Sequence, residues 1–478
     1  MNRTSLVKNG LWATYGAIAT RFLALLSNLI LARLLLPSEF GVIAIAYIFW
    51  GFANLFITNT AGSFLIYKGL DDKRYVNTTY TISLGIGFVL AIAMLALSPL
   101  AAKFFGVPSL IGILAVLAFN LLLSSAQGVY VGVLRQRMQY RELANSTTIS
   151  SLVRVFCTTA CAFLGFSYWS FVIGDTAFWL TICVLMHRQA NLNFRFQIAP
   201  EARAEVLSYC LGATGSGIGL YVNYNCDNFV IGKLLGSTSL GYYNFAYQLT
   251  TSLTTILTQV LSQLGMSVFA QLKDDRQQED ALVKVVERIA FLSAPLYALV
   301  FLVVDERVLS WVFGAKWLPA LAVIPWLLIF AYFRLINVSL SCMLSAKGRP
   351  GVNAKVNLYV APLAVLSFVI GVQQGGIVGV SIAAAIVLGV LWTIYWWWTG
   401  CQTLHWSLMQ FLIPCFKPAI IALVAIGISL SVSTIVQPLL FIGIYLVCGR
   451  FVAAKQFFEC QSLVNRLTHR LVKIPKSM

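Results

Sequence analysis

The sequence has little charge, and least of all acidic charge. Only 10% of its 478 residues are charged, with 16 acidic residues against 33 lysines and arginines, whereas a soluble domain carries about 25% charged residues. Apolar residues make up 59% of the chain, and apolar runs long enough to span a bilayer recur throughout it. These features exclude an ordinary soluble globular protein and predict an all-α polytopic membrane protein.

Motifs for metal, cofactor or nucleotide chemistry are also missing. The ten cysteines form no CxxC pair, and the three histidines lie far apart in the sequence. No Walker A sequence occurs, and the glycines at 215, 217 and 219 lie within a predicted span and do not follow a strand. We therefore expect no metal site, no bound cofactor and no enzymatic activity.

The net charge of +17 would suggest nucleic acid as the partner of a soluble protein. No basic soluble domain exists here, so anionic membrane lipid is the expected partner and nucleic acid is not. Most lysines and arginines fall in alternate loops, and the opposite loops receive only Arg33, Lys103, Lys233, Arg307 and Lys316. This imbalance predicts cytoplasmic N- and C-termini in a multi-pass protein of the plasma membrane.

About fourteen transmembrane helices are expected from the apolar runs. They cover 10–36, 41–67, 77–100, 109–134, 143–166, 168–187, 207–235, 240–270, 284–304, 318–345, 352–372, 377–398, 411–432 and 436–452. The tryptophans at 396–398 fall at a span end, where an aromatic belt at the membrane surface accounts for them.

A repeat links residues 32–47 to residues 232–247 at an offset of 200 without a gap. Five of the sixteen positions are identical, and Arg33 and Lys233 share a positive charge; the identical pairs are Leu34/Leu234, Leu35/Leu235, Gly41/Gly241, Ala46/Ala246 and Tyr47/Tyr247. Such a repeat predicts two lobes with a substrate site between them. We expect an N-terminal six-helix lobe over 1–187, a cytoplasmic linker over 188–206 and a C-terminal six-helix lobe over 207–398. Two extra helices over 399–452 and a basic tail over 453–478 complete the chain. The charge pattern makes the lobes parallel repeats.

The segment Leu31–Gly41 resembles a signature of the polysaccharide transporter family of Wzx-type flippases, in the multidrug/oligosaccharidyl-lipid/polysaccharide exporter superfamily. The segments Asn225–Asn228 and Gly241–Tyr247 resemble the opening of the family's second lobe. The resemblance implies a MATE-like fold and the flipping of an oligosaccharide linked to undecaprenyl diphosphate. The flipped oligosaccharide would be used to build exopolysaccharide, O-antigen or capsule, and polysaccharide polymerase machinery would be a partner.

Ionisable residues within spans are costly in a bilayer, so those that occur are candidates for function. Arg21, Arg154 and Arg334 lie mid-span, and Asn225 belongs to the most hydrophilic stretch of any span. Arginine offers planar bidentate donors and stays charged in apolar surroundings. These four residues are therefore the predicted substrate-binding residues of a cationic cavity between the lobes, which would hold the diphosphate.

Two acidic residues offer alternative readings. Asp227 and Asp175 are candidates for coupling transport to H+ or Na+. Asp227 would otherwise form a helix-end hydrogen bond with a neighbouring asparagine, and Asp175 would otherwise form an internal ion pair with Arg154. The cations Arg33 and Lys233 either snorkel to the interface or touch substrate.

Two other functions compete with a flippase that works by alternating access. A multidrug exporter of the same superfamily would need an acidic cavity, but the candidate arginines outnumber the acids. A membrane glycan polymerase or ligase would need a sizeable external loop with catalytic groups, and the expected external loops are short.

Overall fold

A computed structural model describes residues 3–58, 61–192, 194–272, 274–349, 351–432, 436–454 and 456–458. Every regular element in these ranges is a helix. The chain divides into two compact units. The first contains Met1–Phe245, Val312–Pro319 and Asn357–Val380, and the second contains Ala246–Trp311, Ala320–Val356 and Ser381–Met478. The last residues of the predicted basic tail, from 459 onward, lie outside the described residues.

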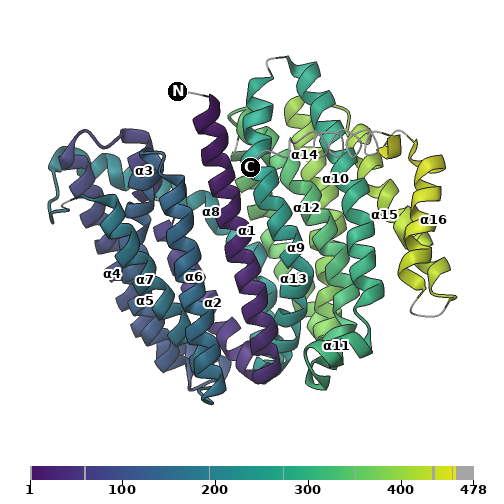
Figure 1. Cartoon of the computed structure of the whole chain (residues 1–478), viewed down its shortest axis with the longest axis horizontal. Coiled ribbons are helices and arrows are strands. Elements are labelled where there is room, and N and C mark those ends of the chain that lie inside the picture. Colours follow the sequence, from purple (N-terminus) through teal and green to yellow (C-terminus); the bar gives the residue numbers. More distant parts are fainter. Residues whose placement is uncertain are drawn as a thin grey trace, which may run out of the picture. The chain divides into compact units, whose positions relative to one another are not determined.

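The first unit is built from eight consecutive helices, and α4, α5, α6 and α7 pack side by side (Figure 1). The eight are α1 (Arg3–Leu34), α2 (Pro37–Thr58), α3 (Ala61–Lys68), α4 (Lys73–Phe105), α5 (Leu110–Gln136), α6 (Tyr140–Phe163), α7 (Trp169–Ala190) and α8 (Pro200–Leu234). The predicted linker is extended over 194–199 and lies along the start of α4. There the backbone N–H groups of Arg195, Gln197 and Ala199 donate to the side chains of Asn77, Thr81 and Thr78.

The second unit holds α10 (Asp275–Val303), α12 (Ile324–Ala346), the π-helix η2 (Ala384–Leu391), α14 (Trp392–Leu404), α15 (Met409–Ser429) and α16 (Gln437–Val452). Four further elements contribute residues to both units: α9 (Gly236–Gln271), α11 (Glu306–Val312), the 3₁₀ helix η1 (Ala315–Ala322) and α13 (Gly351–Ala383). Within α13 the helix breaks at Gly375 and Gly376, where Gly376 takes a φ of +56° that favours glycine. The sequence predicted a connection between two spans at this point, and the helix breaks there.

Among the described residues, nine helices are long and apolar enough to cross a membrane. Their apolar side chains are not all buried: on α4, Phe88, Val89 and Leu100 are more than half exposed. An exposed apolar surface of this kind suits contact with lipid. The prediction of an all-helical, multi-pass membrane protein is therefore confirmed, while the count of fourteen spans stays a prediction.

Equivalent residues of the two repeats face each other where α2 and α9 approach closely within the first unit. A Cβ atom added at Gly41 would overlap the backbone oxygen of Ser237, and one added at Gly241 would overlap the backbone oxygen of Pro37. Residues 37 and 237 are themselves related by the offset of 200, so the two contacts are equivalent with the repeats exchanged. The glycines are needed here because the two backbones touch.

One interpretation of the sequence was wrong. Trp396 and Trp397 do not form an aromatic belt, because they are 1% and 0% exposed; only Trp398 is exposed. The indole N–H groups of Trp396 and Trp397 donate to the backbone oxygen and the side-chain oxygen of Asn337, at 3.3 and 3.1 Å. Asn337 on α12 is itself buried and donates to Thr393 at 2.8 Å. The tryptophans therefore belong to a buried polar network that joins α12 to α14.

Candidate functional site

Arg154 on α6 and Asp175 on α7 form an ion pair in the first unit. The distance from Arg154 Nε to Asp175 Oδ1 is 2.6 Å, and the Asp175 side chain is 11% exposed while that of Arg154 is 39% exposed. Tyr47 on α2 donates its hydroxyl to Asp175 Oδ2 at 2.5 Å and accepts a longer hydrogen bond, 3.5 Å, from Arg154 Nη2. The internal ion pair that the sequence raised for these two residues is therefore present in the first unit.

The pair depends on how closely α6 and α7 pack. Gly174, next to Asp175, faces Thr158 and the backbone oxygen of Arg154, and an added Cβ would overlap the Thr158 hydroxyl. Because Gly174 has no side chain, the α7 backbone comes close enough for a short aspartate to reach the arginine.

Arg334 on α12 occupies a comparable setting in the second unit. Its Nη1 donates to the hydroxyl of Tyr247 on α9 at 2.5 Å, and its guanidinium carbon lies 5.8 Å from the centre of the Phe330 ring. The Phe330 and Tyr247 rings lie 6.1 Å apart. The aromatic pair thus fixes the place of a cation that the sequence identified only as mid-span.

Arg21, the third predicted arginine, differs from the other two. It is exposed on α1 and has no hydrogen-bond or ion-pair partner in the described part of the chain. The structure therefore pairs Arg154 with Asp175, and among the described residues Arg21 forms no hydrogen bond or ion pair with either.

Asp227 on α8 is buried at 4% exposure. Its Oδ1 accepts the backbone N–H of Asn228 at 2.7 Å, and its Oδ2 accepts the hydroxyl of the fully buried Tyr243 on α9 at 2.8 Å. The sequence raised a helix-end hydrogen bond with an asparagine; the observed contact is with the backbone N–H of Asn228 and lies inside α8, not at its end. Tyr243 was not foreseen, because it lies across the turn between two helices.

Asn225 lines an apolar cavity of about 510 Å³ inside the first unit. The walls come from α2, α4, α5, α8 and α13 and include Phe52, Met94, Tyr221 and Phe229. The Asn225 amide donates to the backbone oxygen of Tyr221 at 3.0 Å. None of the predicted site arginines lines this cavity, so its surroundings are apolar and not cationic.

The repeated cations Arg33 and Lys233 both bind a backbone oxygen near the end of another helix. Arg33 Nε donates to Val312 at the end of α11 at 2.8 Å, and Lys233 Nζ donates to Phe104 near the end of α4 at 2.6 Å. Cations are favourable at helix C-termini because they meet carbonyl groups left without intrahelical partners. This contact gives both residues a structural role.

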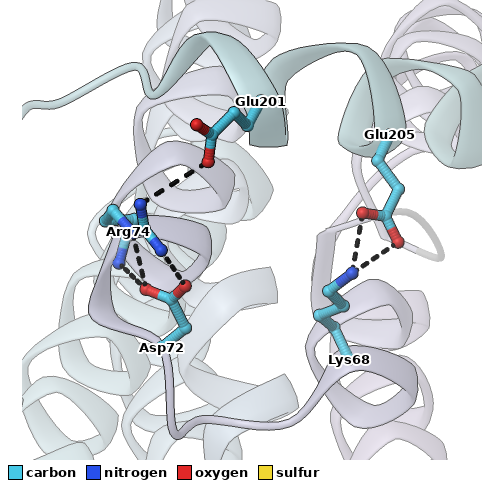
Figure 2. A network of polar contacts seen from close by, with 5 residues as sticks. All are labelled: Lys68, Asp72, Arg74, Glu201 and Glu205. Carbon is cyan, nitrogen blue, oxygen red and sulfur yellow. Dashed lines mark hydrogen bonds and ion pairs between the residues drawn. The ribbon is translucent and has the colours of Figure 1, made fainter.

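An ionic clasp joins the start of α8 to α3 and α4 in the first unit, as Figure 2 shows. We define the clasp as Lys68, Asp72, Arg74, Glu201 and Glu205. Lys68 Nζ lies 2.8 Å from Glu205 Oε2, Arg74 Nη2 lies 3.1 Å from Asp72 Oδ2, and Arg74 Nη1 lies 3.5 Å from Glu201 Oε2. Asp72 also caps α4 by accepting the backbone N–H of Arg74.

The clasp should stop stabilising the folded protein in acid. A hydrogen bond from Lys68 lowers the pKa of the Glu205 carboxyl, which precedes the span expected over 207–235, and hydrogen bonds from Arg74 lower the pKa of Asp72. A carboxyl with a lowered pKa stabilises the fold above its unfolded-state pKa and stops doing so as pH falls through its folded value. We expect wild type to melt at a higher temperature than Glu205→Gln at neutral pH. The difference should shrink as the pH falls below about 4, near the unfolded-state pKa of glutamate, and vanish once the pH is below the lowered folded-state pKa of Glu205.

The exposed neighbour Asp71, for which no clasp contact exists in the described residues, provides the control. Asp71→Asn should leave the melting temperature unchanged at either pH, and salt should weaken the Glu205 effect. A wild-type advantage that persists in acid would contradict the assignment.

The fold is shared with known transporters. The structure of the lipid II flippase MurJ in an inward closed conformation matches with a TM-score of 0.73 and 14% identity, covering 93% of this chain and 98% of that one. An inward-facing multidrug resistance MATE family transporter matches with a TM-score of 0.57 and 14% identity, covering 82% and 94%. The chain therefore shares the fold of MurJ and of the MATE family transporter.

The sequence comparisons place the chain more narrowly. The model of the polysaccharide biosynthesis protein family matches residues 30–322, and the chain belongs to that family. The lipopolysaccharide biosynthesis protein WzxC of Escherichia coli K12 is 20% identical over 91% of this chain and 89% of its own length. The teichuronic acid biosynthesis protein TuaB of Bacillus subtilis 168 is 24% identical over 80% of each chain. The resemblance noted in the sequence is thereby confirmed.

Proposed function

We propose that this protein is a flippase, not an enzyme, that carries an oligosaccharide linked to undecaprenyl diphosphate from the inner to the outer leaflet of the plasma membrane. The observation that carries the proposal is a mid-helix arginine in each unit of a chain from the polysaccharide biosynthesis family. Arg154 lies nine residues before the end of α6, and Arg334 lies ten residues after the start of α12. At 1.5 Å per residue both lie about 15 Å from a helix end, near the middle of a bilayer core of about 30 Å.

The proposal assigns the diphosphate to Arg154, Arg334 and Arg21. A guanidinium donates several N–H groups in a fixed plane that matches phosphate oxygens. Asn225 is assigned to an uncharged part of the substrate, because a lone amide in an apolar wall suits a hydroxyl group better than a diphosphate. Asp227 and Asp175 are proposed to take up H+ or Na+ as the coupling ion.

The proposed architecture follows the sequence. It has fourteen spans, cytoplasmic termini, two six-helix lobes over 1–187 and 207–398 with a linker over 188–206, and two further helices over 399–452. The lobes would rock to expose the site to each side in turn. The product would feed exopolysaccharide, O-antigen or capsule assembly, with polysaccharide polymerase machinery as the next partner.

A headgroup-translocation assay in proteoliposomes tests the function. We expect Arg334→Ala and Arg21→Ala each to slow flipping of a lipid-linked oligosaccharide at least about tenfold, since each loses a charged hydrogen bond to the diphosphate. Arg307→Ala is the control, because this exposed arginine lies at the start of the short helix α11 and not in mid-helix.

Unchanged flipping in both variants would refute the cationic site. Vesicles that export a cationic dye but do not flip the lipid-linked oligosaccharide would favour the multidrug exporter of the same superfamily.

A further inference from the structure

The two tyrosines that the repeat places at equivalent positions both contact a mid-helix arginine. Tyr47 lies ten residues after Pro37, the first residue of α2, and Tyr247 lies ten residues after Ser237 on α9. In the first unit the Tyr47 hydroxyl contacts Arg154 and Asp175, and in the second unit the Tyr247 hydroxyl contacts Arg334. In each unit the same residue of the repeat thus accepts an N–H from a mid-helix arginine, and Tyr47 also donates to Asp175.

The arginines themselves are not equivalent in the repeat. The offset of 200 relates Arg154 to Ala354 and Arg334 to Leu134. Arg154 belongs to α6 and Arg334 to α12, and the offset of 200 does not superpose these two helices. The repeat therefore duplicates the tyrosine hydroxyl but not the arginine. The arginine that contacts this hydroxyl comes from a different position of the repeat in each unit.

A tyrosine hydroxyl is well suited to orient a guanidinium without neutralising it. It accepts an N–H from the arginine as a neutral group and adds no charge of its own. Its ring has few rotamers, and the Tyr247 ring packs near Phe330, so the hydroxyl is held at a defined place. In the Arg154 site, Tyr47 also holds Asp175, the acid that pairs with the arginine.

We propose that Tyr47 and Tyr247 are positioning residues that orient Arg154 and Arg334 toward the diphosphate of the lipid-linked substrate. This inference rests on the proposed function. Depth supports it: ten residues of helix correspond to about 15 Å, the same distance from a helix end as the two arginines. The contact at Tyr247 is shorter than the one between Arg154 and Tyr47, so Tyr247 should matter more to its arginine.

The test uses tyrosine-to-phenylalanine variants in proteoliposomes with purified full-length protein. Tyr247→Phe keeps the ring and removes the hydroxyl, and we expect the substrate concentration for half-maximal flipping to rise about tenfold while the maximal rate is retained. Tyr47→Phe should raise it less. Tyr332→Phe is the matched control, because it removes a buried hydroxyl that donates to the Cys415 backbone oxygen at 2.6 Å and has no hydrogen bond to an arginine in the described part of the chain.

A double-mutant cycle separates positioning from a general structural role. If Tyr247 acts through Arg334, Tyr247→Phe should add nothing in the Arg334→Ala background. Additive effects of the two substitutions would overturn the inference, and so would a half-maximal substrate concentration for Tyr247→Phe equal to that of the Tyr332→Phe control. In both cases flipping by the wild type would still support the proposed function. Wild-type vesicles that fail to flip the substrate would overturn both.

Discussion

Gly41→Ala should destabilise the protein by about 3 kcal/mol, and Gly241→Ala should do the same. Each new Cβ would lie inside the contact distance of a backbone oxygen, of Ser237 in one case and Pro37 in the other. A side chain could rotate away from such a contact, but here two helix backbones must move apart, which places the cost at the upper end of the range for overpacking. The melting temperature of the purified protein in detergent, followed by tryptophan fluorescence, measures the effect.

Gly85→Ala is the matched control for this experiment. Gly85 lies within α4, and beyond the adjoining backbone of that helix and its two chain neighbours no atom of the described residues lies within 4 Å of an added Cβ. Alanine favours a helix interior over glycine by about 0.5–1 kcal/mol, so this variant should be as stable as wild type or more so. If Gly41→Ala and Gly85→Ala melted together, the close approach of α2 and α9 would not exist in the folded protein.

Arg154→Ala should cost about 3 kcal/mol of folding free energy. The substitution removes the ion-pair partner of the Asp175 carboxylate, which is only 11% exposed. The hydrogen bond from the Tyr47 hydroxyl remains, but it brings no positive charge. Breaking a buried pair from one side costs about 3–5 kcal/mol, and the lower figure applies because the Arg154 side chain is 39% exposed and partly screened. Chemical unfolding in detergent micelles would measure this loss.

The double variant Arg154→Gln with Asp175→Asn should be more stable than Arg154→Ala alone. Two neutral amides leave no charge without a partner, so most of the cost disappears. Arg21→Ala is the control for removing an arginine, since Arg21 is exposed on α1. A double variant as unstable as the single one would show that the charge pair does not determine stability here.

These predictions depend on contacts that the sequence revealed to different degrees. An internal ion pair between Arg154 and Asp175 was one of the alternatives raised from the sequence, and the two residues do pair. Tyr47 and Tyr247 are an identical pair of the repeat, so the sequence marked them as equivalent residues. It did not show which side chains they contact. Tyr243 gave no signal at all as the partner of Asp227, because that contact forms only when α8 and α9 pack together.

The buried tryptophans show the limit most clearly. Trp396 and Trp397 stand at a predicted span end, where the composition alone favours the membrane surface. Their burial depends on Asn337, about sixty residues earlier, which accepts both indole N–H groups. A local pattern cannot register a partner so far away in the chain.

The sequence by itself determined that the chain crosses a membrane through many helices, that it carries a repeat and which family it resembles. These are local properties, since transfer into lipid depends on the apolar residues of one segment and a repeat is visible in the letters. Only the tertiary structure decided that Arg154 pairs with Asp175, that Arg334 meets Tyr247, and that Gly41 and Gly241 face opposite backbones. Such contacts depend on how each helix is rotated about its axis and packed against helices distant in sequence, and no single segment specifies either.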